Sequence, residues 1–226
     1  MTRTMSARIA GFTFLFYVAV ALPAMVLFDK ATSAQGIAAK LALIAQHASD
    51  VRVAIVLSLL TCFAAPVLAV ALYGITRDED NELAVLALSC RIGEGVLSAV
   101  FVIATLGLLW LATAWTSAGA PDAAAAYALG AFLLKVRDWN TTIGATFFAV
   151  GSTLFSYLLL RGRTVPVPLA SLGVIASVLL VLGLSLQLTG FLHGTATLLM
   201  WLPVAVFELT LGPWLLIKGV AEPATR

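Results

Sequence analysis

Long apolar runs separated by short charged intervals dominate the chain. Six of these runs are about 20 residues or longer, the length that an α-helix needs to cross about 30 Å of hydrocarbon. We predict membrane-spanning helices over 9–28, 53–75, 83–114, 139–160, 167–188 and 197–217. The third run is longer than one perpendicular crossing requires, so we expect its helix to tilt or to project from the bilayer.

Two longer polar intervals also contain helical patterns. Within 37–44 apolar residues recur every three or four positions, and Ser33 is placed to cap this segment. In the second interval, Pro121 and Asp122 suit the first turn of a helix that continues through an alanine-rich stretch to about Leu133. We expect both segments to lie in the outer membrane interface, either as binding elements or, as we favour, as a cover over neighbouring helices.

These patterns predict an all-α fold, a polytopic membrane helix bundle of about six transmembrane helices plus two interfacial outer helices. Hydrophobic residues make up 62% of the chain and charged residues 11%, whereas soluble domains have about 45–50% and about 25%. No linker or low-complexity tract interrupts residues 1–226, so we expect a single transmembrane helical domain. The first run, about 20 residues, exceeds the apolar core of about 7–15 residues in a signal peptide, and we expect it to be retained.

The distribution of Lys and Arg predicts the orientation of the helices. With the N-terminus in the cytoplasm, the inner side holds Arg3, Arg8, Arg77, Arg161, Arg163, Lys218 and Arg226. The positive residues on the outer side lie in the two longest loops, whereas the short loops carry their positive charge inside. We therefore expect both termini to be cytoplasmic.

Ionisable residues at membrane depth are the strongest candidates for function, because each costs about 2.5–3.5 kcal/mol to insert. Arg91 and Glu94 lie three residues apart on one face of the third predicted span, where they can pair, and Ser98 continues that face. Glu208 lies inside the sixth span. With a rise of about 1.5 Å per residue, Arg91 is about 12 Å and Glu208 about 15 Å from the same side, so a bridge between them is geometrically feasible.

One positive and two negative charges leave one carboxyl group without a counter-ion. Either this group is protonated or reached by water or a cation, as a proton-coupled carrier requires, or it is a neutral glutamic acid that pins helix packing through a hydrogen bond. We favour the packing role. Ala205 and Gly212 share the helical face of Glu208, which predicts that its side chain points toward protein.

Signatures of enzymes and cofactors are scarce in this sequence. His47 and His193 lie in separate outer loops, and no spacing supports a metal site with Asp50 or Asp122. Nucleophile-elbow, zinc-protease and phosphate-loop motifs do not occur. We therefore expect no enzymatic activity, no cofactor and no metal, and the net charge of +2 gives no reason to expect a nucleic-acid partner.

Five short motifs occur in a characteristic order. They are Ala7-Arg-Ile-Ala-Gly11, Arg91-Ile-Gly-Glu94, Ile143-Gly-Ala-Thr-Phe-Phe148, Ser156-Tyr-Leu-Leu-Leu-Arg161 and Glu208-Leu-Thr-Leu-Gly-Pro-Trp-Leu-Leu-Ile-Lys-Gly219. In order and spacing they resemble domain-of-unknown-function family 4386 of bacterial integral membrane proteins. The resemblance implies a bacterial plasma (inner) membrane protein without assigned activity, in which the RxxE motif and the later Glu recur. Many members carry His and Asp where this chain has Arg137 and Thr142, so we do not carry over a role that rests on that histidine.

Three functions follow as expectations for a protein surrounded by the lipid bilayer. The first is a non-enzymatic bundle that binds a lipid, a small hydrophobic ligand or a partner membrane protein through a buried polar cluster. This cluster consists of Arg91, Glu94, Ser98 and Glu208. The alternatives are a small proton- or cation-coupled carrier that uses Glu208, and a membrane-embedded enzyme acting on a lipid from the outer face.

Overall fold

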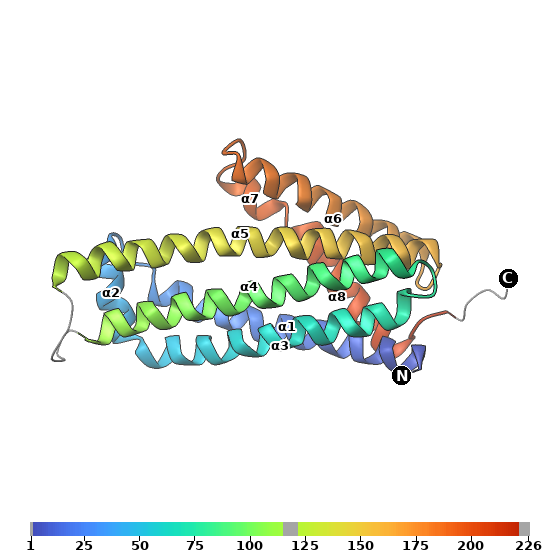
Figure 1. The fold of residues 1–226 in the computed structure, drawn as a ribbon, viewed down its shortest axis with the longest axis horizontal. Coiled ribbons are helices and arrows are strands. Elements are labelled where there is room, and N and C mark those ends of the chain that lie inside the picture. The colour runs from blue at the N-terminus through green and yellow to red at the C-terminus, as the bar shows by residue number, and fades with distance from the viewer. Residues whose placement is uncertain (1, 115–121, 222–226) are drawn as a thin grey trace. The chain divides into compact units, whose positions relative to one another are not determined.

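The computed structural model describes residues 2–114 and 122–221, which form α-helices and contain no strand (Figure 1). The helices are α1 (Arg3–Ala31), α2 (Ile37–Gln46), α3 (Ala48–Thr76), α4 (Asn81–Thr113), α5 (Ala123–Arg161), α6 (Val167–Leu188), α7 (Thr195–Leu199) and α8 (Leu202–Ile217). Within the described residues, six stretches are long and apolar enough to cross a membrane: α1, α3, α4, α5, α6 and Thr195–Ile217. The predicted all-α bundle of six spans is confirmed. The expected helix start at Pro121 and the charge at Arg226 lie outside the described residues.

Large apolar side chains cover the outer faces of these helices. Phe63, Ile103 and Ile175 expose 71%, 67% and 59% of their surface. Large apolar residues exposed in such number are rare on soluble monomers, because water penalises apolar surface. The hydrocarbon of a bilayer does not penalise apolar surface. Together with the six apolar helices, this exposed surface shows that the chain is an integral membrane protein.

The chain packs as two compact units. The first contains the described residues of Met1–Tyr17, Phe63–Gly95 and Thr142–Arg226, and the second contains those of Val18–Cys62 and Val96–Thr141. Helices α1, α3, α4 and α5 contribute residues to both units.

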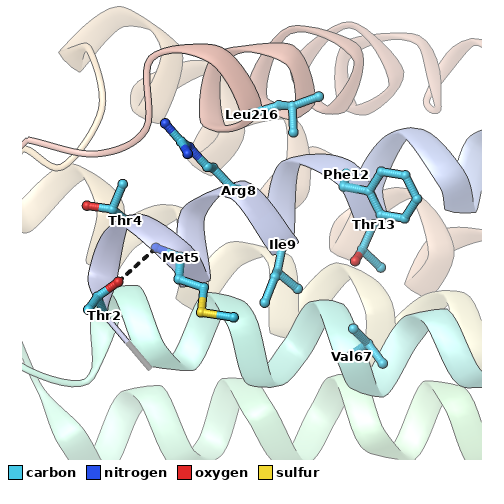
Figure 2. A pocket seen from close by; sticks show the side chains of 9 residues that line it. All are labelled: Thr2, Thr4, Met5, Arg8, Ile9, Phe12, Thr13, Val67 and Leu216. Carbon is cyan, nitrogen blue, oxygen red and sulfur yellow. Dashed lines mark hydrogen bonds between the residues drawn. The ribbon is translucent and has the colours of Figure 1, made fainter.

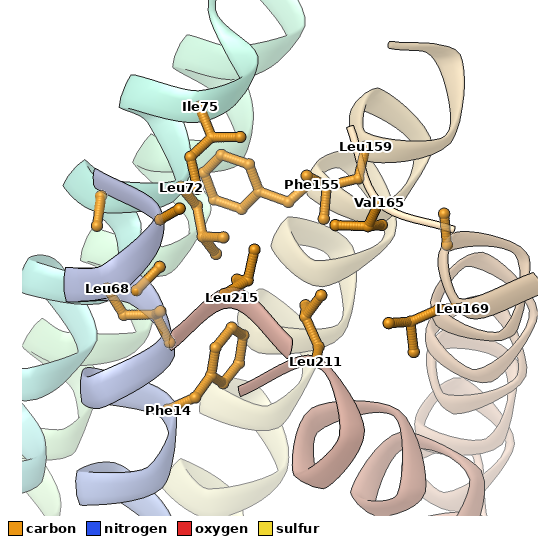
Figure 3. Packing of buried hydrophobic residues seen from close by; sticks show 14 of the residues in the cluster. Phe14, Leu68, Leu72, Ile75, Phe155, Leu159, Val165, Leu169, Leu211 and Leu215 are labelled. Carbon is orange, nitrogen blue, oxygen red and sulfur yellow. The ribbon is translucent and has the colours of Figure 1, made fainter. Parts of the chain in front are cut away.

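An apolar core in the first unit joins the start of α1 to the end of α8. Phe14 of α1, Leu72 of α3, Phe155 of α5 and Leu215 of α8 are buried together (Figure 3). Gly11 faces the backbone of α8 so closely that a Cβ atom would collide with it. The first residues of α1 and the last residues of α8 therefore lie at the same end of this unit.

Charged residues close the turns at this end. The Leu83 N–H donates to Asp80 Oδ1 at 3.2 Å, so Asp80 caps the first turn of α4. Arg161 Nη1 donates to the other oxygen of Asp80 at 3.1 Å. The polar turn that was predicted to end the second span thus also ties down the end of α5.

Helix α2 forms where the first outer helix was predicted, with Leu41 and Ile44 fully buried in the second unit. The predicted cap is wrong, because the Ser33 hydroxyl donates to the Lys30 carbonyl at 3.1 Å. Gly36 occupies the N-cap position instead. Its φ of 79° is a backbone conformation that glycine adopts more readily than residues with a side chain. The location of α2 in the membrane interface stays a prediction.

The second predicted outer helix forms, but it is continuous with the fourth span. Ala123–Arg161 is one helix of 39 residues, so the expected gap before a span beginning at Trp139 does not exist. Asp122 was predicted in the first turn, but it lies one residue before the helix and caps it, since the Ala125 N–H donates to Asp122 Oδ1 at 2.7 Å. Polar residues at 135–140 end the apolar run but leave backbone hydrogen bonding intact, and no proline interrupts it.

The sixth span is broken near its start. Helix α7 ends at Leu199, and α8 begins at Leu202 after a turn at Met200 and Trp201. Pro203 lies in the first turn of α8, where its missing N–H costs no hydrogen bond. A helix break therefore precedes Pro203, and the proline itself disrupts no hydrogen bond of α8.

Candidate functional site

Arg91 and Glu94 form the predicted pair on α4. Arg91 Nη1 lies 2.8 Å from Glu94 Oε2. The two residues expose only 2% and 5% of their surface. Because they are three residues apart, one helical face presents both side chains to the interior of the first unit.

Side chains from two other helices complete the surroundings of this pair. The Tyr17 hydroxyl of α1 donates to Glu94 Oε1 at 3.2 Å. The ring of Phe148 on α5 faces the Arg91 guanidinium, with 4.7 Å between its carbon and the ring centroid. Gly151, also on α5, has no side chain to displace the Arg91 methylenes that pack against it. The pair is therefore held by α1, α4 and α5 together.

Glu208 lies beside this pair without joining it. It is close enough to interact electrostatically with Arg91 and Glu94. Among residues 2–114 and 122–221, however, its carboxyl group makes no hydrogen bond or ion pair. The bridge from Arg91 to Glu208 that depth suggested is not formed, since Glu94 is the nearer partner on the same helix. Glu208 is half-buried, between buried Phe207 and exposed Leu209 on α8.

The pair leaves one donor unused. Arg91 Nε is buried and has no hydrogen-bond partner in the described part of the chain. A buried donor without an acceptor costs about 1–3 kcal/mol. Ser98, the fourth predicted site residue, is half-buried on α4 and belongs to the second unit.

The sequence comparison decides the family. A family model described as domain of unknown function DUF4386 matches residues 9–219, nearly the whole chain. The chain belongs to the DUF4386 family. The matched range includes Arg91, Glu94 and Glu208, and it confirms the resemblance inferred from the five motifs. Neither the curated proteins nor the solved structures yield a match.

A second buried cation in this DUF4386 protein was missed by sequence reasoning. Arg137 exposes 8% of its surface, and its guanidinium carbon lies 3.2 Å from the ring centroid of Phe28 and 3.9 Å from that of Phe101. Its Nη1 donates to Thr105 Oγ1 at 2.8 Å. Asn140, one turn later, donates to the Leu97 carbonyl at 2.9 Å. The only sequence signal was the placement of Arg137 and Asn140 on one helical face.

The histidines of the DUF4386 chain do not assemble a metal centre within the residues that the structure describes. His47 Nδ1 lies 3.1 Å from Asp50 Oδ2, and Lys30 Nζ lies 3.6 Å from the same oxygen. His193 is exposed in the turn before α7, in the first unit. In the ranges 2–114 and 122–221 no three His, Cys, Asp or Glu residues come together.

Proposed function

We propose that this DUF4386 protein is a non-enzymatic membrane bundle that binds a small amphiphile through Glu208. The proposal rests on a difference in hydrogen bonding and ion pairing between Glu94 and Glu208. Glu94 is paired with Arg91 and accepts a hydrogen bond from Tyr17, whereas Glu208 has no hydrogen bond or ion pair among the described residues. Only the second carboxyl group is open to a ligand.

The surroundings of Glu208 define the chemistry of such a ligand. A polar group at membrane depth is costly without a partner, so a hydroxyl or ammonium group that donates to Glu208 would offset that cost. A polar head that donates a hydrogen bond therefore suits Glu208. Exposed apolar residues of α8, such as Val206 and Leu209, suit an apolar body.

The substitution Glu208→Gln tests this proposal. We expect the variant to keep its fold, because Glu208 makes no ion pair among the described residues, and to lose a small molecule that co-purifies with the unmodified protein. The measurement is native mass spectrometry of protein extracted in mild detergent, followed by identification of the retained small molecules. The affinity for this small molecule should fall about tenfold if its hydrogen bond to the carboxyl group contributes about 1.4 kcal/mol.

Glu82→Gln is the matched control, because Glu82 is an exposed carboxylate at the start of α4. This variant should retain the same small molecule. Identical adducts on both variants and on the unmodified protein would rule out Glu208 as the binding group.

A proton-coupled carrier is the second candidate, supported by the helix break between α7 and α8, seven residues before Glu208. Broken helices line substrate sites in many transporters. In proteoliposomes with an imposed pH gradient, a carrier would accumulate the co-purified molecule, and a protonophore would abolish the uptake. A binder would show the same retention with and without the gradient.

Two further roles remain as outcomes of these measurements. A protein that co-purifies in place of a small molecule would favour a partner-binding bundle, and metal bound to the purified protein would favour the outer-face lipid enzyme. We also propose that the protein resides in a bacterial plasma membrane with both termini in the cytoplasm. Positive charge near the short turns supports this orientation.

A further inference from the structure

An open crevice of about 580 Å³ lies on the first unit, between the start of α1, the middle of α3 and the end of α8 (Figure 2). Its volume falls within the range of about 300–1,000 Å³ that is typical of small-molecule sites. It contains neither Glu208 nor Arg91, so this crevice is separate from the site proposed above.

One end of the crevice is polar and positively charged. Thr2, Thr4 and Arg8 line it, and no lining residue is acidic. Arg8 is exposed and makes no hydrogen bond or ion pair within residues 2–114 and 122–221. The Thr2 hydroxyl oxygen accepts from the Met5 N–H at 3.3 Å, which leaves the hydroxyl hydrogen free to donate (Figure 2).

A second arginine, Arg3, lies near this end but outside the residues that line the crevice. Arg3 Nη2 donates to the Ile75 carbonyl at 3.0 Å, but its Nε and Nη1 are buried without a partner in the described residues. Arg3 and Arg8 are five residues apart on α1. Neither Arg3 nor Arg8 forms an ion pair with a carboxylate within the described chain.

The other end of the crevice is apolar. Phe12 and Val67 expose 61% and 49% of their surface, and Ile9, Leu216 and the buried Thr13 line the same end. Phe12 is eight residues after Thr4 on the same helix, so the polar and apolar ends are about 12 Å apart. In Figure 2 Thr2 and Thr4 lie toward one side, and Phe12, Thr13 and Val67 lie toward the other. A cation next to an apolar wall on a lipid-covered surface matches a phospholipid.

We propose that this crevice binds one anionic phospholipid from the leaflet at the end of the bundle where α1 begins and α8 ends. The phosphate lies beside Arg8 and the two threonine hydroxyls, and an acyl chain runs along Ile9, Phe12 and Val67. Charge complementarity selects the anionic lipid: two arginines without a counter-ion attract a negative headgroup, and a neutral headgroup gains no such attraction.

Native mass spectrometry of the full chain, titrated with phosphatidylglycerol and separately with phosphatidylcholine, tests the proposal. We expect the unmodified protein to retain phosphatidylglycerol at lower lipid concentration. Arg8→Gln should weaken its binding about fivefold, since one cation near an anionic headgroup contributes about 1 kcal/mol, and should leave phosphatidylcholine binding unchanged. Arg8→Lys keeps the charge and should retain most of the affinity.

Arg52→Gln is the matched control, because Arg52 is exposed, makes no hydrogen bond or ion pair in the described chain and lies outside the crevice. Its phosphatidylglycerol affinity should equal that of the unmodified protein. The proposal fails if Arg8→Gln and Arg52→Gln behave alike, or if phosphatidylcholine binds as tightly as phosphatidylglycerol. It also fails if excess inorganic phosphate displaces the lipid, or if Arg8→Gln dissociates a dimer instead.

Discussion

At the scale of single residues, the buried charges differ in how they are compensated. Arg91 has a carboxylate at 2.8 Å, whereas Arg137 is held by two aromatic rings and the hydroxyl of Thr105. A desolvated cation over an aromatic face gains about 2 kcal/mol, which makes the aromatic arrangement a real alternative to an ion pair. Glu208 has neither kind of compensation among the described residues.

Glu94→Gln should destabilise the protein strongly. It removes the charge that compensates Arg91 while preserving the shape of the side chain, and uncompensated buried charges cost about 3–5 kcal/mol. The free energy of unfolding can be measured in detergent by denaturant titration followed through tryptophan fluorescence. Replacing both members of the pair by methionine should restore most of the loss, because the double variant leaves no charge behind. A loss no larger than that of Glu82→Gln would contradict this account.

At the scale of secondary-structure elements, close backbone approach shapes the first unit. The side chains of Phe207 on α8 and Ser156 on α5 occupy the space that a Cβ atom on Gly173 of α6 would need. Small residues allow helices in lipid to approach closely, and packing there replaces the hydrophobic effect as the driving force. The fold identifies the side chains that face Gly173, and they come from α5 and α8.

Gly173→Val should therefore weaken packing by about 1–3 kcal/mol, the usual cost of inserting side-chain volume into a filled site. Gly173→Ala should cost less, because Phe207 needs to move less. Leu179→Val, on an exposed position of the same helix, is the control and should be neutral. Apparent melting temperatures in detergent would rank the three variants. Equal values for Gly173→Val and Leu179→Val would show that α6 is not tightly packed at Gly173.

At the scale of the whole molecule, the count of spans constrains topology. Six crossings return the chain to the side on which it began, in agreement with the first residues of α1 lying beside the last residues of α8 in the first unit. Positive residues gather near the short turns at that end, including Arg77 and Arg161. The positive-inside rule then favours the cytoplasm for both termini.

Cysteine labelling in intact cells would test this topology. In a background without Cys62 and Cys90, we expect a thiol reagent that cannot cross membranes to label Gln35→Cys, in the first outer loop. Asp78→Cys, in the short turn after α3, should react only after the membrane is permeabilised. The opposite pattern would place both termini outside, and labelling of both positions would mean that the number of crossings is wrong.

The sequence by itself determined the fold class, the number of spans and the pairing of Arg91 with Glu94, because hydrocarbon demands apolar helices of a minimum length and local spacing places these two residues on one helical face. The ends of the helices were harder to predict from the sequence. Polar residues at 135–140 resembled a loop, yet α5 continues through them, since only proline or a competing cap ends backbone hydrogen bonding.

Only the tertiary structure decided which residues from distant helices meet. Tyr17 reaches Glu94 across 77 positions of sequence, and Arg137 reaches Thr105 across 32. It also showed that Glu208 is left out of the ion pair. The physical reason is that partner choice depends on the rotation and close approach of packed helices, which periodicity within each helix does not encode.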